Sequence, residues 1–145
     1  MVVYDTVELL KECSAGIQMG VASIDGVLSA VKDQSLNQKL TASKQAHETL
    51  GQETHSLLLH CGEHRASPSP MALGMSWLKT NTKLAMNESD STVAGLITDG
   101  CNMGVKSLTG FLNRYAAADE KAKDLARRLI AEEENLAVNL RPYLQ

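Results

Sequence analysis

The chain has 145 residues, 43% of them hydrophobic and only 3% aromatic, and a formal net charge of −3. This length suits one globular domain, 1–145, with a core of aliphatic side chains. Lysine and arginine are scattered, which argues against a nucleic-acid surface, and no stretch approaches the ~20 apolar residues of a membrane span. Because the first residues lack a basic start followed by an apolar run, we expect a cytoplasmic protein.

The first half of the chain predicts two long helices. Apolar residues recur every three or four positions over 4–32, with Asp5 or Thr6 as the expected helix start. A short break follows, and a second apolar stripe covers 36–62, ending at Gly62, a residue suited to a left-handed helix stop. So short a connection predicts an antiparallel helical hairpin.

The second half predicts another pair of helices. Ser89 or Ser91 is the expected cap of a third helix, whose apolar residues share one broad face. Asp119 is the expected cap of a fourth helix, which continues until Pro142.

A long crossover joins the two hairpins. Proline and serine in 62–70 indicate a linker, and apolar spacing in 71–85 predicts a short amphipathic helix. A connection of this length can travel back along most of a long helix. We therefore expect an all-α, up-down-down-up four-helix bundle.

Two glycine-rich stretches match each other. AGIQMGVASIDGVL at 15–28 and DGCNMGVKSLTGFL at 99–112 agree at seven of fourteen positions at an offset of 84. The match predicts that the hairpin is present twice. Four of its glycines, Gly16, Gly20, Gly100 and Gly104, predict side-chain-free patches where helices one and three approach closely. The alternative is that these glycines mark mild kinks.

Two related hairpins and a crossover resemble the ferritin-like superfamily, and specifically a small bacterial member of unknown function. The resemblance implies a di-metal site built from a Glu on each of helices one and three and a Glu-x-x-His on each of helices two and four. The corresponding residues here are Gln18, Asn102, Glu48 and Glu132. The two histidines and two of the carboxylates are thus missing, so we expect the metal site to be reduced or lost.

The same region predicts a polar layer at mid-bundle. Its expected members are Gln18, His47, Glu48, Asn102, Glu132 and Glu133. One interpretation is a hydrogen-bonded layer that fixes the register of the helices. The alternative is a metal site formed by His47, Glu48 and Glu132 together with one further carboxylate, either Glu133 or Asp25.

Two other groups of residues could carry chemistry. His60 and His64 are four residues apart and form a second candidate metal site, although Gly62 is expected to end the helix between them. Cys13, Cys61 and Cys101 are spaced too far apart for a disulfide framework. We expect these three cysteines to be small buried hydrophobic residues.

The sequence favours a structural or interaction module over an enzyme, forming a homodimer and needing no cofactor. The enzyme alternative is a metal-dependent oxidoreductase or a metal-storage protein that uses iron, manganese or zinc. A further alternative is a bundle that binds a small ligand in its mid-bundle polar layer.

Overall fold

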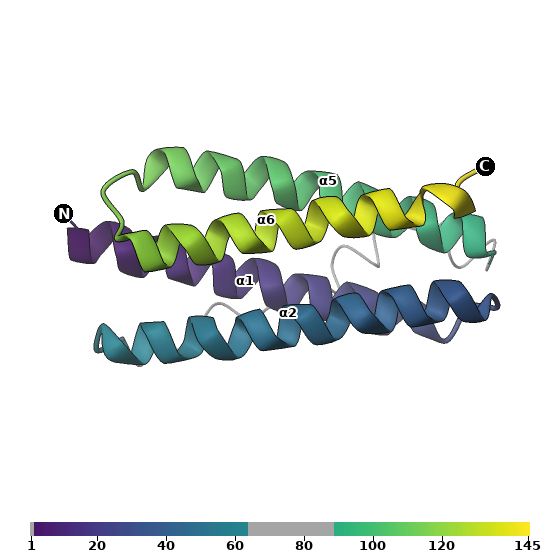
Figure 1. Ribbon diagram of the computed structural model, residues 1–145, viewed down its shortest axis with the longest axis horizontal. Coiled ribbons are helices and arrows are strands. Elements are labelled where there is room, and N and C mark those ends of the chain that lie inside the picture. The colour runs from purple at the N-terminus through teal and green to yellow at the C-terminus, as the bar shows by residue number, and fades with distance from the viewer. Residues whose placement is uncertain (1, 64–88) are drawn as a thin grey trace.

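The computed structural model describes residues 2–63 and 89–145, which form four long helices (Figure 1). These are α1 (Val2–Leu28), α2 (Gln34–His60), α5 (Asp90–Arg114) and α6 (Glu120–Leu140), followed by a 3-10 turn, η1 (Arg141–Tyr143). The described ranges contain no strand, so the predicted all-helical, four-helix class is confirmed. The expected short helix at 71–85 and most of the linker at 62–70 lie outside the described residues. None of the described helices is long and apolar enough to cross a membrane.

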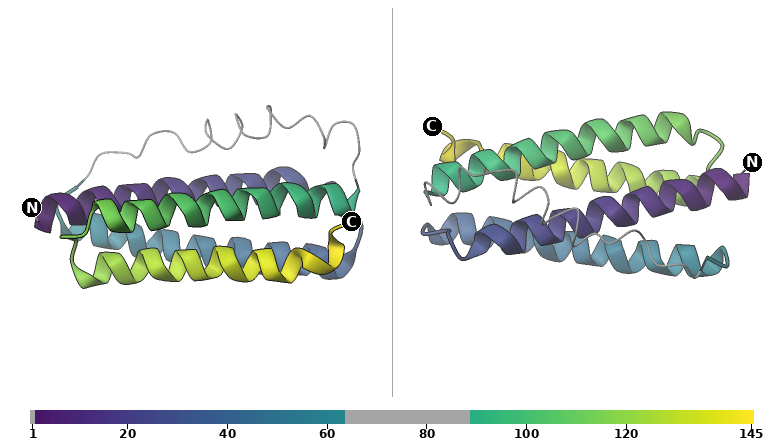
Figure 2. Two further views of the ribbon diagram at one scale, coloured as in Figure 1. Left: turned by 90° about the horizontal axis from the view of Figure 1, so that it is seen from above. Right: turned by 180° about the vertical axis from the view of Figure 1, so that it is seen from behind.

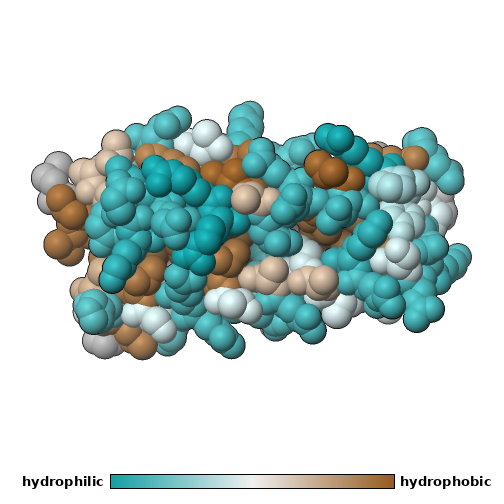
Figure 3. Space-filling model, in the orientation of Figure 1, coloured by the Kyte–Doolittle hydropathy of each residue, from teal (hydrophilic) through white to brown (hydrophobic). Residues whose placement is uncertain are grey.

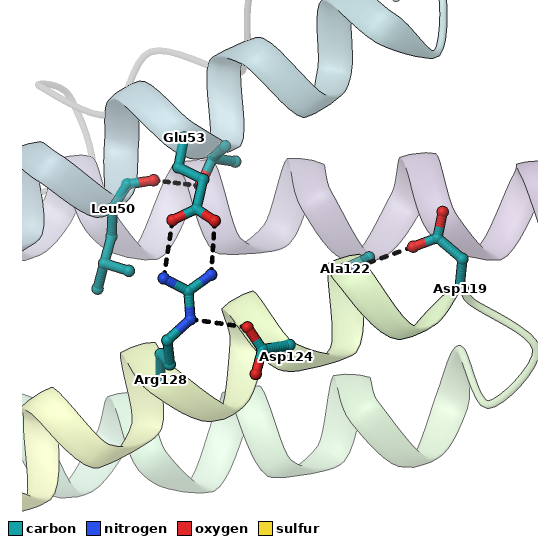
Figure 4. Close-up of polar contacts among 7 residues, drawn as sticks. Leu50, Glu53, Asp119, Ala122, Asp124 and Arg128 are labelled. Carbon is teal, nitrogen blue, oxygen red and sulfur yellow. Dashed lines mark hydrogen bonds and ion pairs between the residues drawn. The ribbon is translucent and has the colours of Figure 1, made fainter.

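Local sequence signals set most helix ends. Ser89 and Asp119 cap α5 and α6 as predicted, and each side chain accepts a hydrogen bond from the backbone N–H three residues on. Figure 4 shows this bond between Asp119 and the N–H of Ala122. Asp33 caps α2 in the same way. After α2, Gly62 adopts a φ of 79°, the left-handed conformation that glycine tolerates best.

Helix α1 differs from its prediction at both ends. It covers Val2–Leu28 rather than 4–32, and neither Asp5 nor Thr6 caps it. Both residues instead serve the turn between α5 and α6. The Asp5 carboxylate accepts a hydrogen bond from the N–H of Ala117 at 3.0 Å, and the Thr6 hydroxyl accepts one from the N–H of Asp119 at 2.8 Å. Asp5 and Thr6, the expected start of the first helix, therefore connect the two hairpins instead.

The second hairpin makes a corresponding contact with the turn of the first hairpin. Asp90, in the first turn of α5, accepts hydrogen bonds from the N–H groups of Lys32 at 2.8 Å and Asp33 at 2.9 Å, in the turn between α1 and α2. These bonds place the start of α5 beside the α1–α2 turn and the start of α1 beside the α5–α6 turn. Consequently α1 and α6 run in one direction, and α2 and α5 run in the other (Figure 1).

The helices form two layers around a divided core. Helices α1 and α5 lie in one layer and α2 and α6 in the other (Figure 2). One apolar cluster occupies the half of the bundle where α1 begins, with Leu9, Leu10, Cys13, Ile17, Leu50, Leu58, Leu108, Leu125 and Leu129 among its members. The other occupies the half where α1 ends, with Ile24, Val27, Leu36, Leu40, Val93, Ile97, Cys101, Leu136 and Leu140 among its members.

The outer face over α2 and α6 is mostly hydrophilic, and apolar residues show at the end of the bundle where α1 begins (Figure 3). On this face Arg128 of α6 donates two hydrogen bonds, of 2.6 and 2.8 Å, to the carboxylate of Glu53 on α2 (Figure 4). It donates a third, of 2.8 Å, to Asp124. Because these side chains are exposed, we expect the contact to contribute at most about 1 kcal/mol to folding.

Candidate functional site

A buried polar pair separates the two apolar clusters. His47 of α2 and Glu133 of α6 are 1% and 8% exposed, and the Nε2 of His47 lies 3.1 Å from the Oε1 of Glu133. Each residue lies on the apolar stripe of its own helix, between buried neighbours. The pair therefore occupies core positions where apolar side chains would fit the helical pattern.

Both ring nitrogens of His47 have partners. Nδ1 lies 2.8 Å from the carbonyl oxygen of Ser43 and donates to it, while Nε2 faces the carboxylate of Glu133. Burial lowers the pKa of His47, but the hydrogen bond and charge of Glu133, the Ser43 carbonyl and the charge of Glu132 outweigh burial, so that the pKa is raised above its usual value. These contacts favour an imidazolium held between a carbonyl and a carboxylate.

Two neighbours extend the pair into a small polar network. The hydroxyl of Ser43 donates to the Oε2 of Glu132 at 2.8 Å, which fixes this half-buried carboxylate beside the histidine. On α5, burial raises the pKa of the Cys101 thiol, and a hydrogen bond with Glu133 and that residue's charge raise it further. The thiol of Cys101 therefore stays protonated beside the carboxylate of Glu133.

A pocket of about 280 Å³ lies between α1 and α5, with His47 and Glu133 on the opposite layer. Its α1 lining includes Ala15, Met19, Ser23 and Ile24, and its α5 lining includes Ile97, Met103, Ser107, Leu108 and Phe111. Most of these side chains are apolar. The pocket thus combines apolar walls with a few polar groups, the combination typical of small-molecule sites.

Glycines line the pocket and leave room for the buried pair. The four are Gly16, Gly20, Gly100 and Gly104. A Cβ on Gly20 would lie 2.9 Å from the Cδ2 of His47, and a Cβ on Gly104 would lie 3.5 Å from the carboxylate of Glu133. The prediction that Gly16, Gly20 and Gly104 bring α1 and α5 together is therefore wrong, because a Cβ on each would meet α2 or α6. For Gly100 it stays a prediction. Gly20 and Gly104 face the His47–Glu133 pair of the other layer, Gly16 faces Leu129 of α6, and a pocket lies between α1 and α5.

Three of the six residues predicted to form the mid-bundle polar layer do not lie beside the His47–Glu133 pair. Glu48 and Asn102 are exposed. Gln18 is half-buried and donates to the hydroxyl of Ser14, one turn earlier on its own helix, at 2.9 Å. The prediction that these three residues point toward the bundle axis is wrong. Of the predicted set, the structure brings together His47, Glu132 and Glu133.

The wrong choice of Glu48 comes from the alignment of α2 with α6, the second helix of each hairpin. The glycine stretches match at an offset of 84, and this offset pairs Glu48 with Glu132. The buried partners His47 and Glu133 are 86 residues apart. The helix caps Asp33 and Asp119 are separated by the same interval. Aligning the caps, rather than extending the glycine match, identifies the correct pair.

The predicted metal ligands do not converge. Within 2–63 and 89–145, no three His, Cys, Asp or Glu side chains are placed to hold a metal ion. Asp25 instead pairs with Lys44, with a carboxylate oxygen 2.7 Å from Nζ. His60 is exposed at the end of α2, and His64 lies outside the described residues.

The cysteines are free, and they differ in their environment. Cys13 and Cys101 are buried as expected, and burial raises the pKa of the Cys13 thiol to about 12. Cys61 is exposed, so the prediction that all three are buried is wrong. The reason is its position: it follows the last residue of α2 and precedes the Gly62 turn.

The pocket, with the pair of His47 and Glu133 at its inner side, is the candidate functional site of this chain. Comparisons of the chain with protein-family models, with curated proteins and with solved structures give no match.

Proposed function

We propose that this chain is a ferritin-like helical bundle that acts as a binding module, and that it takes up a small, mostly apolar molecule in the pocket between α1 and α5. The observation that carries the proposal is an apolar pocket of about 280 Å³ with the buried pair of His47 and Glu133 at its inner side. The ferritin-like part rests on the two hairpins, the directions of the helices and the reciprocal turn contacts.

Stability alone gives little reason for a charged pair at this position. Removing two charged groups from water costs several kcal/mol per ion, and well-packed apolar residues in place of a buried ion pair are often neutral or stabilising. The glycines add a second cost of about 1 kcal/mol each within a helix. A bundle with only a structural role would be stabilised by filling this space, whereas a binding module needs both the space and the polar group.

The donor set favours an organic ligand over two metal ions. A di-iron or di-manganese centre requires several carboxylates and usually imidazole. Among the described residues of α2 and α6, Glu133 is the one carboxylate that lines the pocket, and the hydroxyl of Ser43 holds Glu132. Both nitrogens of His47 also have partners, so the imidazole offers no free lone pair to a metal.

Titration with indole tests the proposal. Met19 and Met103 line the pocket from its two sides, and ¹³C-methyl labelling of methionine makes both observable by NMR. We expect both signals to shift and to saturate with a Kd below about 1 mM, which corresponds to roughly −4 kcal/mol for this small probe.

A matched pair of variants locates the binding. Ser107 and Thr109 are both exposed on α5, but only Ser107 lines the pocket. We expect Ser107→Trp to abolish the shifts and Thr109→Trp to leave them unchanged, with thermal unfolding showing that both variants fold. Methionine signals that do not move, or that move equally in both variants, would refute the proposed pocket.

A further inference from the structure

The charge of the pocket is the starting point for identifying its ligand. The charged side chains among its described lining residues are Glu12, His47 and Glu133, and no lysine or arginine is among them. Even with His47 protonated, the described part of the lining holds two carboxylates against one imidazolium. An anionic ligand would therefore meet two carboxylates and one imidazolium that already has partners.

Glu133 is the group that can still bind a ligand. A carboxylate has about four lone-pair sites. Its Oε1 accepts from His47, and the thiol of Cys101 lies beside the same carboxylate. The side chain nevertheless retains 10% exposure and lines the pocket. Gly20 and Gly104 flank the carboxylate from α1 and α5, and neither has a side chain to cover it.

We infer that the pocket selects a small amine with an apolar body over the corresponding carboxylate, and that Glu133 accepts the hydrogen bond of the ammonium group. This inference rests on the proposed function and specifies its ligand class. Desolvation of an ammonium is costly, and pairing with a carboxylate offsets that cost. The apolar body of the amine would lie against Met19, Met103 and Phe111. Their sulfur and aromatic groups also attract the methylene groups next to the ammonium.

Two probes with the same body and opposite charge test the inference. 2-Phenylethylamine and 3-phenylpropionate each carry a phenyl ring on a two-carbon chain, and their Kd values are measured from the Met19 and Met103 signals at pH 6 and low salt. We expect the amine to bind at least about tenfold more tightly, a difference of about 1.4 kcal/mol.

Glu133→Gln and Glu134→Gln form the matched pair of variants. They change the net charge equally on adjacent residues of α6, but Glu134 is exposed and does not line the pocket. We expect Glu133→Gln to reduce the preference for the amine to within about twofold and Glu134→Gln to preserve it. If Glu133→Gln does not fold, Glu133→Asp keeps the charge but withdraws the carboxylate, and we expect it to weaken amine binding several-fold.

The outcomes separate the inference from the proposed function. If indole binds and 3-phenylpropionate binds as tightly as the amine, the ligand class is wrong and the pocket remains. An equal loss of preference in Glu133→Gln and Glu134→Gln would also overturn the role of Glu133. If none of the three probes moves the methionine signals, the proposed function itself fails.

Discussion

His47 and Glu133 form an ion pair across the two helices α2 and α6, and this pair divides the core into two apolar clusters. The two side chains compensate each other's charge in a region from which water is largely excluded. Removing one partner leaves the other buried and uncompensated, whereas removing both leaves no buried charge. The energetic consequence of the pair is therefore strongly non-additive.

Single and double substitutions measure this coupling. We expect His47→Leu or Glu133→Leu alone to lower the free energy of unfolding by about 3–5 kcal/mol, and the double variant to recover most of that loss. Urea denaturation provides the values. Arg128→Ala, which removes the exposed ion pair with Glu53, serves as a control with an expected effect below about 1 kcal/mol. Additive losses in the double variant would contradict a coupled pair.

The pair also predicts a pH dependence of stability. The pKa of His47 is raised in the folded protein, so the folded state holds its proton more tightly than the unfolded chain. The stabilisation is complete below the unfolded histidine pKa of about 6.5 and is lost as pH rises through the folded pKa. The groups facing His47 are Glu132 and Glu133 on α6 and Ser43 on its own helix.

The expected result is a free energy of unfolding that falls between pH 6 and pH 8, with a slope of at most about 1.4 kcal/mol per pH unit for one proton. Restricting the range to this window limits the contribution of Cys101, whose thiol has a raised pKa and affects stability at higher pH. In His47→Gln the slope should flatten. An unchanged slope in this variant would assign the pH dependence to another group.

Two glycine substitutions should have opposite effects. Gly20→Ala places a Cβ 2.9 Å from the ring of His47, which two hydrogen bonds hold in place. We expect a net loss of about 2 kcal/mol, although alanine is the better helix former. Gly110→Ala meets nothing within 4 Å and should stabilise the protein by about 0.5–1 kcal/mol. Thermal unfolding distinguishes the two signs, and a stabilising Gly20→Ala would disprove the close contact.

Asp90→Ala tests the contact between the hairpins. The substitution removes the acceptor for the N–H groups of Lys32 and Asp33, and we expect a loss of about 1–2 kcal/mol. Asp99→Ala, at an exposed position of the same helix, should change stability by less than about 0.5 kcal/mol. Amide exchange provides a second measurement, because Lys32 and Asp33 should lose protection only in the Asp90 variant.

Local signals in the sequence predict the helices well. Ser89, Asp119 and Gly62 act within a few residues of their own positions, and each marks a helix end in the structure. The start of α1 is not predicted, because Asp5 and Thr6 are helix-start residues whose partners lie in a turn more than 100 positions away. The residue pattern of α1 alone does not indicate that Asp5 and Thr6 bind the N–H groups of Ala117 and Asp119.

The site is predicted only in part, for a related reason. His47 lies on a regular apolar stripe, so its burial can be read from spacing alone. Its partner depends on how α2 and α6 align. An offset of 86 matches His47 with Glu133, whereas an offset of 84 matches His47 with Ala131 and Glu48 with Glu132. The pocket is harder still to predict. A glycine in a helix indicates that a side chain is absent, but not which neighbouring helix or side chain occupies the space.

The reciprocal bonds at the two turns make each hairpin complete only in the presence of the other. Asp90 satisfies donors in the first hairpin, and Asp5 and Thr6 satisfy donors in the second. Separation of the hairpins would expose both halves of the core and leave four backbone N–H groups without these acceptors at the same time. The bundle should consequently unfold as one cooperative unit, with no populated intermediate in which one hairpin is folded and the other is not.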